Sequence, residues 1–294
     1  MSAPPTPAET RSGHSATAVW LVLASIVSVQ IGAAFAKDVF GQVTPTTMTW
    51  LRLMLGTVIL LPFARPSLRG RSRGDWVVVF AYGATLAFMN WSFYQSISRI
   101  PLGLAVTVEF LGPLSVALVS SRRPRDLVWA LLAATGVALL GGIPDHINLA
   151  GVLFAAAAGA AWASYIWVSR ATGARWEGLD GLVLGGAIAS VLLSPLALAH
   201  GVPDGIEGHV LMVGAAVALL SSVIPYSLEL HALRTMNPGL FGILMSVEPA
   251  AAAMAAMVIL GEVLPLQGWL AIGCVVFASA GATWAATRAA PQPA

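Results

Sequence analysis

Charged residues are scarce in this chain. Only 10% of its 294 residues are Asp, Glu, Lys or Arg, while 57% are hydrophobic. A soluble domain carries about 25% charged residues, so a water-soluble fold of this composition would lack the polar surface needed to cover itself. The composition therefore predicts a polytopic membrane protein.

Cysteine and clustered histidine are also lacking. The single cysteine, Cys274, lies in an apolar run, which excludes a disulfide framework and a cysteine-based metal cluster. The five histidines are scattered, and no pair stands at metal-ligand spacing with a third ligand. We therefore expect no metal and no other cofactor. No Walker motif is present, which excludes ATP as the direct energy source.

Long apolar runs dominate the rest of the chain. A bilayer-spanning helix needs about 20 apolar residues, and the runs are joined by short connections with no room for a soluble domain. The ends, 1–16 and 288–294, are expected to be loose cytoplasmic tails, and no cleavable signal peptide is expected. The ten predicted spans are 17–36, 46–64, 76–97, 102–121, 127–143, 149–169, 179–199, 209–231, 238–260 and 265–286.

The basic residues indicate an orientation for these spans. If the N-terminus lies inside, most of the 15 Lys and Arg residues fall in inside segments, and only Lys37 and Arg99 fall in outside loops. Cytoplasmic loops carry such an excess of positive charge, so the pattern predicts that both termini are inside. The net charge of +2 is thus an orientation signal and does not indicate nucleic-acid binding.

The two halves of the chain, 17–143 and 149–287, are predicted to be repeats. Aligning Pro113 with Pro249 brings Arg99 within one position of Arg234. Because each half has five spans, an odd number, the halves cross the membrane in opposite senses. The predicted fold is an all-α bundle of ten transmembrane helices built from two inverted repeats, an arrangement whose interface commonly holds the substrate.

Glutamates stand beside prolines inside the predicted spans. Glu109 lies four residues before Pro113, which removes a backbone donor, and Glu248 directly precedes Pro249. A carboxylate in hydrocarbon is costly, so these groups should face protein or water. We expect Glu109 to take part in proton coupling or to hold a substrate ammonium, with a structural hydrogen-bonded carboxylate as the alternative. Glu248 and Glu229 are further candidates. Glu248 could instead be a charge-paired hinge residue, and Glu229 could reach the interface or pair with Arg234.

Two basic residues are candidates for the same site. Arg52 is the only basic residue well inside a predicted span, and its guanidinium fork suits a carboxylate. It could bind a substrate carboxylate, pair with a buried acid or extend to the outer interface. Lys37, at the end of the first span, is either an interfacial anchor or a guide for the substrate.

Aromatic and amide side chains in the spans are candidates for lining a cavity. Asn90 and Tyr94 are four residues apart and share a helix face. Aromatic faces can hold an ammonium by cation–π contact, although helix packing or an interfacial belt is an alternative reading. The candidates are Asn90, Trp91 and Tyr94 in the third span, Trp162 and Tyr165 in the sixth, and Tyr226 in the eighth.

Seven stretches of the sequence carry a resemblance to a known family: 30–37 (QIGAAFAK), 51–57 (LRLMLGT), 89–90 (MN), 101–113, 120–124 (SSRRP), 225–229 (PYSLE) and 244–249 (LMSVEP). The second half also carries the Glu-Pro pair and then Leu-Gly-Glu at 260–262. With these residues the sequence resembles the EamA-type drug/metabolite transporters, and within them the bacterial threonine/homoserine exporters. The matching place after the fourth span reads SRRP at 121–124, and we interpret that difference as variation between halves.

The resemblance implies a secondary transporter of the inner membrane that exports small amino acids by proton-driven alternating access. Spans 3, 4, 8 and 9 would line its site, with another amino acid or small metabolite as an alternative substrate. An intramembrane enzyme is disfavoured because no aspartate lies deep in a span and no Ser–His pair is evident. A channel or an inert scaffold is disfavoured by glutamates beside helix breaks. The expected partners are substrate, protons and lipid, and the choice between monomer and homodimer stays open.

Overall fold

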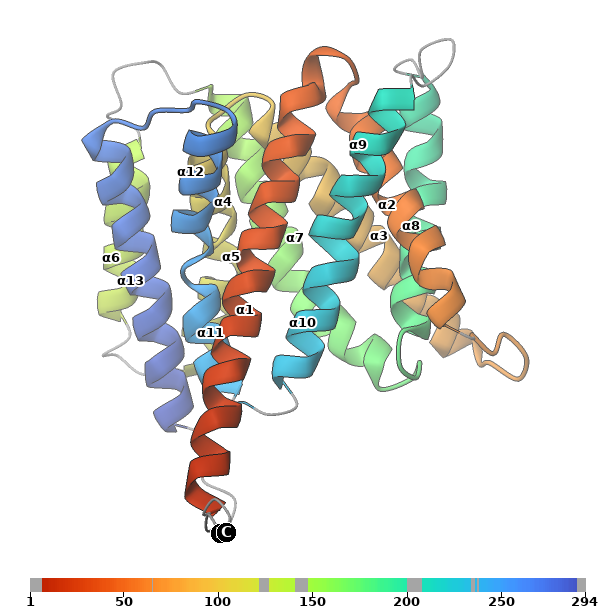
Figure 1. Cartoon of the computed structure of the whole chain (residues 1–294), viewed down its shortest axis with the longest axis horizontal. Coiled ribbons are helices and arrows are strands. Elements are labelled where there is room, and N and C mark those ends of the chain that lie inside the picture. The colour runs from red at the N-terminus through yellow and green to blue at the C-terminus, as the bar shows by residue number, and fades with distance from the viewer. Residues whose placement is uncertain are drawn as a thin grey trace, which may run out of the picture.

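The structure is a computed structural model that describes residues 7–64, 66–121, 127–140, 148–199, 208–233, 236 and 238–289. Within these ranges every regular element is a helix, and most of the helices stand side by side in one bundle (Figure 1). The helices are α1 (Pro7–Asp38), α2 (Pro45–Leu60), α3 (Arg73–Ile97), α4 (Leu102–Glu109), α5 (Leu111–Ser121), α6 (Leu127–Leu140), α7 (Leu149–Gly173), α8 (Asp180–Ala199), α9 (Gly208–Ala218), α10 (Ile224–Leu233), α11 (Pro238–Met245), α12 (Glu248–Ile259) and α13 (Leu266–Ala289).

Taken together with the short helices that continue them, all but one of these helices form segments long and apolar enough to cross a bilayer. In the part of the chain that the structure describes, nine segments of at least 18 residues meet that requirement. The exception is α6, whose 14 residues span about 21 Å, less than the ~30 Å hydrocarbon core. The chain is therefore an all-helical multi-pass membrane protein, as its composition predicts.

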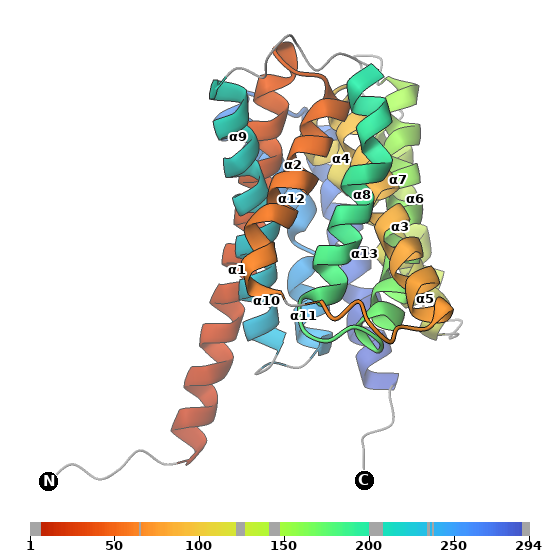
Figure 2. The same ribbon diagram turned by 90° about the vertical axis from the view of Figure 1, so that its right-hand side faces the viewer.

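The start of α1 and the end of α13 lie at the same end of the bundle, which we call the terminal end (Figure 2). The α2–α3 and α7–α8 connections lie there too, whereas α1–α2 and α12–α13 turn at the opposite end (Figures 1 and 2). α1 begins at Pro7, ahead of the predicted start at 17, and residues 1–6 and 290–294 lie outside the described part. Several basic residues on which the predicted orientation rests also lie outside the described part. They are Arg65, Arg122, Arg123, Arg125 and Arg234.

Three of the spans are interrupted in mid-course. The fourth breaks at Phe110, between α4 and α5, where Pro113 cannot donate a backbone hydrogen bond to the carbonyl of residue 109. The ninth breaks at 246–247, and α12 then restarts with Pro249 in its first turn, a position that proline favours. Between α9 and α10 the helix widens into a π-helical segment, Leu219–Val223. π-bulges of this kind are frequent at functional sites.

Glycines bring the broken spans close to their neighbours. A Cβ atom added to Gly112 of α5 would lie 2.0 Å from the carbonyl oxygen of Gly159 of α7. A Cβ atom added to Gly103 of α4 would lie 2.6 Å from the Cβ of Ala253 of α12. Small residues allow helix backbones to approach this closely in membranes. The breaks are therefore held in a tightly packed part of the bundle.

Candidate functional site

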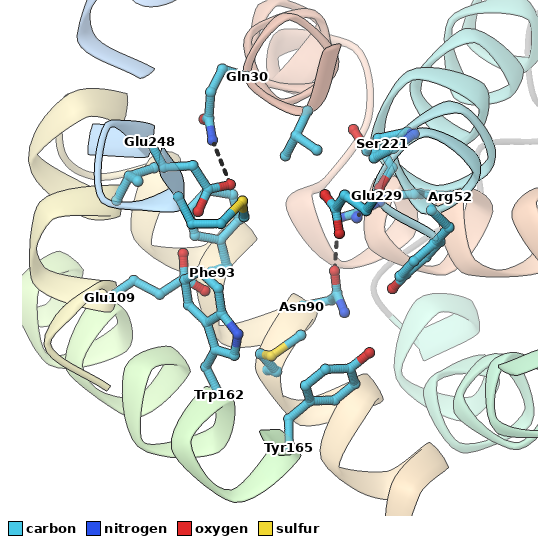
Figure 3. A pocket seen from close by; sticks show the side chains of 16 residues that line it. Gln30, Arg52, Asn90, Phe93, Glu109, Trp162, Tyr165, Ser221, Glu229 and Glu248 are labelled. Carbon is cyan, nitrogen blue, oxygen red and sulfur yellow. Dashed lines mark hydrogen bonds between the residues drawn. The ribbon is translucent and has the colours of Figure 1, made fainter. Parts of the chain in front are cut away.

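A cavity of about 210 Å³ lies among the three interruptions, near the middle of the bundle (Figure 3). It receives side chains from α1, α2, α3, α4, α7, the π-helical segment, α10, α11 and α12. Spans 3, 4, 8 and 9, which the sequence suggested, thus contribute, and spans 1, 2 and 6 contribute as well. The lining residues are Val29, Gln30, Arg52, Met89, Asn90, Phe93, Val106, Glu109, Trp162, Tyr165, Ser221, Pro225, Tyr226, Glu229, Met245 and Glu248.

One side of the cavity carries carboxyl groups. Glu109 is the last residue of α4 and Glu248 the first of α12, so both breaks place a glutamate at the cavity. Gln30 of α1 lies beside Glu248, with its Nε2 donating over 3.5 Å to the Glu248 Oε1. The Gln30 Oε1 and the Glu248 Oε2 are buried and accept no hydrogen bond from the described residues. This side therefore offers free acceptors to a ligand that brings donors.

The other side carries a guanidinium. Arg52 donates from Nη1 to the Asn90 Oδ1 over 2.7 Å and from Nη2 to the Ser221 carbonyl oxygen over 3.0 Å. The Ser221 carbonyl belongs to the π-helical segment. The Arg52 Nε has no partner among the described residues. Neutral groups thus hold the guanidinium in place, and it forms no salt bridge with any of the described residues.

Arg52 is separated by the hollow from two of the three carboxyl groups, those of Glu109 and Glu248. Figure 3 shows Glu109 and Glu248 on one side of the cavity and Arg52 with Ser221 on the other. Within the described ranges, the salt bridges are Lys37–Glu262 and Arg175–Asp75, and neither involves a cavity residue. Buried charges are costly unless they are paired. The arrangement can therefore bind a molecule with a positive end and a negative end.

Glu229 is the third carboxyl group at the cavity. It lies on α10, and the Ser25 Oγ of α1 donates to its Oε1 over 2.5 Å. This hydrogen bond links the first span to the eighth beside the hollow. Arg234, the partner that the sequence suggests for Glu229, lies outside the described residues.

Four of the aromatic and amide candidates line the cavity and two do not. Asn90, Trp162, Tyr165 and Tyr226 are among the lining residues. Tyr165 also contacts Tyr82, their hydroxyl oxygens being 3.2 Å apart. These side chains give the cavity a mixed aromatic and polar wall.

Trp91 and Tyr94 of α3 are not among the lining residues, although the guanidinium of Arg52 lies 5.7 Å from the centroid of the Tyr94 ring. The Trp91 Nε1 donates to the Thr46 Oγ1 over 3.1 Å, so its indole points toward the start of α2. Tyr94 is 1% exposed and contacts the rings of Phe40 and Phe93. It lies one turn beyond Asn90, toward the opposite end, where the helices close over it.

Lys37 also lies away from the cavity. At the opposite end of the bundle its Nζ forms a salt bridge with the Glu262 Oε1 and donates to the Ile100 carbonyl oxygen over 2.8 Å. The Glu262 Oε2 accepts from the backbone N–H of Leu102, the first residue of α4, over 2.9 Å. We call Lys37, Glu262 and this N-terminus the latch, since they join the ends of the first, fourth and ninth spans.

Gln30 and Ser221 are cavity residues that sequence reasoning did not single out. Gln30 could have been found, because an amide in the middle of an apolar run is unusual and is 3% exposed here. Ser221 gives no such signal, since its carbonyl is available to Arg52 only through the π-helical backbone. No cluster of three or more His, Cys, Asp or Glu side chains suited to a metal is found within the described ranges.

Comparisons with known proteins agree with the resemblance noted in the sequence. The chain is 41% identical to the threonine/homoserine exporter RhtA of Escherichia coli K12 over 272 residues, 90% of this chain and 92% of that one. It is 40% identical to RhtA of Salmonella typhimurium LT2 over the same shares, and 25% identical to the uncharacterized transporter YwfM of Bacillus subtilis over 79% of this chain and 82% of that one.

A solved structure and a family model extend these matches. One crystal structure superposes with a TM-score of 0.64 at 22% identity, over 93% of this chain and 98% of that one, which supports the fold alone. The model of the EamA-like transporter family matches twice, over residues 16–142 and 149–284. RhtA and YwfM, the relatives named above, are transporters and not enzymes. With most of its length covered in two matches, the chain belongs to the EamA-like transporter family.

Proposed function

We propose that this protein is a secondary transporter of the cytoplasmic membrane that exports small amino acids of the threonine and homoserine kind. The observation that carries the proposal is that the guanidinium of Arg52 faces the carboxyl groups of Glu109 and Glu248 across one cavity, and that these groups form no salt bridge among the described residues. An amino acid at neutral pH carries one charge of each sign at fixed separation. The two relatives that are 40–41% identical carry the name of threonine/homoserine exporters.

The substrate binds with its carboxylate toward Arg52 and its ammonium toward the glutamates. A guanidinium can hold a carboxylate through two parallel hydrogen bonds, and the free Nε of Arg52 is available for one of them. The ammonium has three donors, which suit Glu109 and the free oxygens of Gln30 and Glu248. The cavity, at about 210 Å³, is smaller than the roughly 300–1,000 Å³ of sites for drug-sized ligands. It therefore favours a small metabolite.

Transport proceeds by alternating access between two inverted five-helix repeats, with ten crossings and both termini inside. The two family matches correspond to the two halves. α4 of the first half packs against α12 of the second at the opposite end (Figure 1), where the latch also lies. With the termini inside, this end is the outer one. The packing of α4 against α12 and the latch support a state closed toward the outside.

The inner side offers a route to the cavity. A smaller hollow of about 60 Å³ shares Arg52, Asn90 and Tyr226 with the main cavity. It continues to Leu60 at the end of α2 and Leu182 near the start of α8, toward the terminal end. Substrate enters along this side from the cytoplasm and leaves after the outer end opens.

Protons reset the carrier through Glu109 or Glu248. Both groups lie at helix breaks that border the hollow, where a proton can replace the substrate ammonium as the partner of a carboxylate. The reconstituted protein should therefore accumulate substrate when a pH gradient is imposed. Equal transport with and without the gradient would remove the proton step and leave the amino-acid site untouched.

Efflux from whole cells tests the function. Cells that produce the protein should export threonine and homoserine, and tolerate them in the medium, better than cells without it. Glu109→Gln should abolish most of this export at unchanged membrane abundance. Glu177→Gln, which changes an exposed acid between α7 and α8, should leave it intact. No export of any amino acid in a broad panel would refute the proposal, and export of a different amino acid would reassign the substrate.

Counterflow distinguishes a carrier from a channel. Vesicles preloaded with unlabelled threonine should take up labelled threonine faster than empty vesicles, because a carrier exchanges one molecule for another. Equal uptake by both kinds of vesicle would favour a channel.

A further inference from the structure

We infer that Trp162 sets the upper size of the substrate side chain, an inference that rests on the proposed amino-acid site. Trp162 lies on α7 and lines the cavity on the same side as Glu109 (Figure 3). It is one of the largest side chains at the hollow. Its indole therefore decides how much space remains beside a bound ammonium.

The indole is held by the residue at the break of the fourth span. The Phe110 ring meets the Trp162 ring edge to face, with centroids 5.3 Å apart and planes at 87°. Phe110 is 2% exposed and directly follows Glu109. Aromatic pairs prefer this geometry and are stabilised by it beyond their buried area. Two consecutive residues of the fourth span therefore shape this part of the site. Glu109 supplies the carboxyl group, and Phe110 holds the Trp162 indole.

The backbone of α7 is fixed against the same break. A Cβ atom added to Gly159 would lie 2.6 Å from the Glu109 carbonyl oxygen, and one added to Gly112 would lie 2.0 Å from the Gly159 carbonyl oxygen. Gly159 is one helical turn before Trp162. Because the two backbones are already in contact, α7 cannot move closer to the break of the fourth span. The Phe110 ring also blocks one direction in which the indole could move away from the cavity. Trp162 is therefore a rigid wall.

A rigid wall beside the ammonium site limits the substrate side chain. The Cα substituent of an amino acid lies one bond from the carbon that bears the ammonium, so a substrate held by Glu109 brings its side chain near Trp162. A short side chain fits the remaining space, whereas an aromatic side chain would overlap the indole. Packed interiors do not yield easily to such overlap.

Exchange of the indole for a smaller group tests the inference. Export of threonine and phenylalanine is measured in the same cells for the wild type, Trp162→Phe and Trp162→Ala, with membrane abundance as a check. The phenylalanine-to-threonine ratio should rise by about tenfold or more in Trp162→Ala, the discrimination expected of a hydrophobic size filter. The rise should be smaller in Trp162→Phe. Trp167→Ala, which removes a 59% exposed indole from the same helix, should leave the ratio unchanged.

The outcomes separate this inference from the proposed function. If the wild type exports no amino acid, the proposed function fails. If the wild type exports threonine but the ratio in Trp162→Ala stays at the wild-type value, the size filter alone fails. Loss of all export in both Trp162 variants, at normal abundance, would also overturn it, because Trp162 would then be needed for transport itself.

Discussion

In the proposed orientation, with both termini inside, Glu262→Gln should open the outer end of the bundle. Glu262 holds Lys37 of α1 by a salt bridge and the first backbone N–H of α4 by a hydrogen bond. The variant keeps an oxygen that can accept from Leu102 but loses the ionic contact with Lys37. Because the latch is formed at the end where α4 and α12 meet, its loss should favour the state in which they separate.

The size of the effect follows from the burial of the latch. The side chains of Lys37 and Glu262 are 19% and 18% exposed, so their interaction is only partly screened by water. Hydrogen bonds to charged groups contribute about 1.5–3 kcal/mol. Each 1.4 kcal/mol changes an equilibrium tenfold. While the closed state still predominates, the open fraction should therefore rise by roughly 10- to 150-fold.

Thiol labelling from outside the cell measures the open fraction. The chain has one cysteine, so Cys274→Ala gives a background without thiols. Met89→Cys then places a single thiol at the cavity lining. A membrane-impermeant maleimide added outside should label it faster in Glu262→Gln by the same factor, and an excess of threonine should slow the labelling.

Asp38→Asn is the matched control. Asp38 is an exposed acid next to Lys37 at the same end of the bundle, and it takes part in neither contact of the latch. Its labelling rate should equal that of the background protein. If Glu262→Gln and Asp38→Asn are both labelled at the rate of the background protein, the assignment of the latch as an outer closure is refuted. Faster labelling in both would point to surface charge as the cause.

Two further changes test the site and the packing around it. Arg52→Lys should lower export at least tenfold at unchanged abundance. An ammonium cannot reproduce the guanidinium fork that contacts Asn90, Ser221 and a substrate carboxylate. Export at the wild-type rate would contradict the role assigned to Arg52. Gly103→Ala should destabilise the detergent-solubilised protein by about 1–3 kcal/mol, seen as a lower melting temperature, because the new methyl group meets Ala253. Gly273→Ala, where nothing lies within 4 Å, should melt no lower than the wild type, and equal melting of both variants would argue against close α4–α12 packing.

The composition and order of residues determined the class of this protein and the segments of its fold. Long apolar runs with few charges have to be helices in a bilayer, because only helices or closed barrels satisfy the backbone there. Pro113 and Pro249 likewise determined where helices break, since proline lacks a donor wherever it lies. Glu109, Glu248 and Arg52 could be predicted as site residues because their charges are costly in hydrocarbon whatever the packing.

Only the tertiary structure decided which of these residues meet and which do not. Tyr94 shares a helix face with Asn90 but is covered by Phe40, and Lys37 is bound by Glu262 more than 200 positions away in the chain. Arg52 could have paired with an acid, yet the packing gives it an amide and a π-helical carbonyl and leaves Glu109 and Glu248 across the hollow. Helical periodicity relates neighbours within one span, whereas the contacts between spans depend on how the glycine-rich surfaces pack together. That packing is a property of the whole bundle, and no single stretch of sequence contains it.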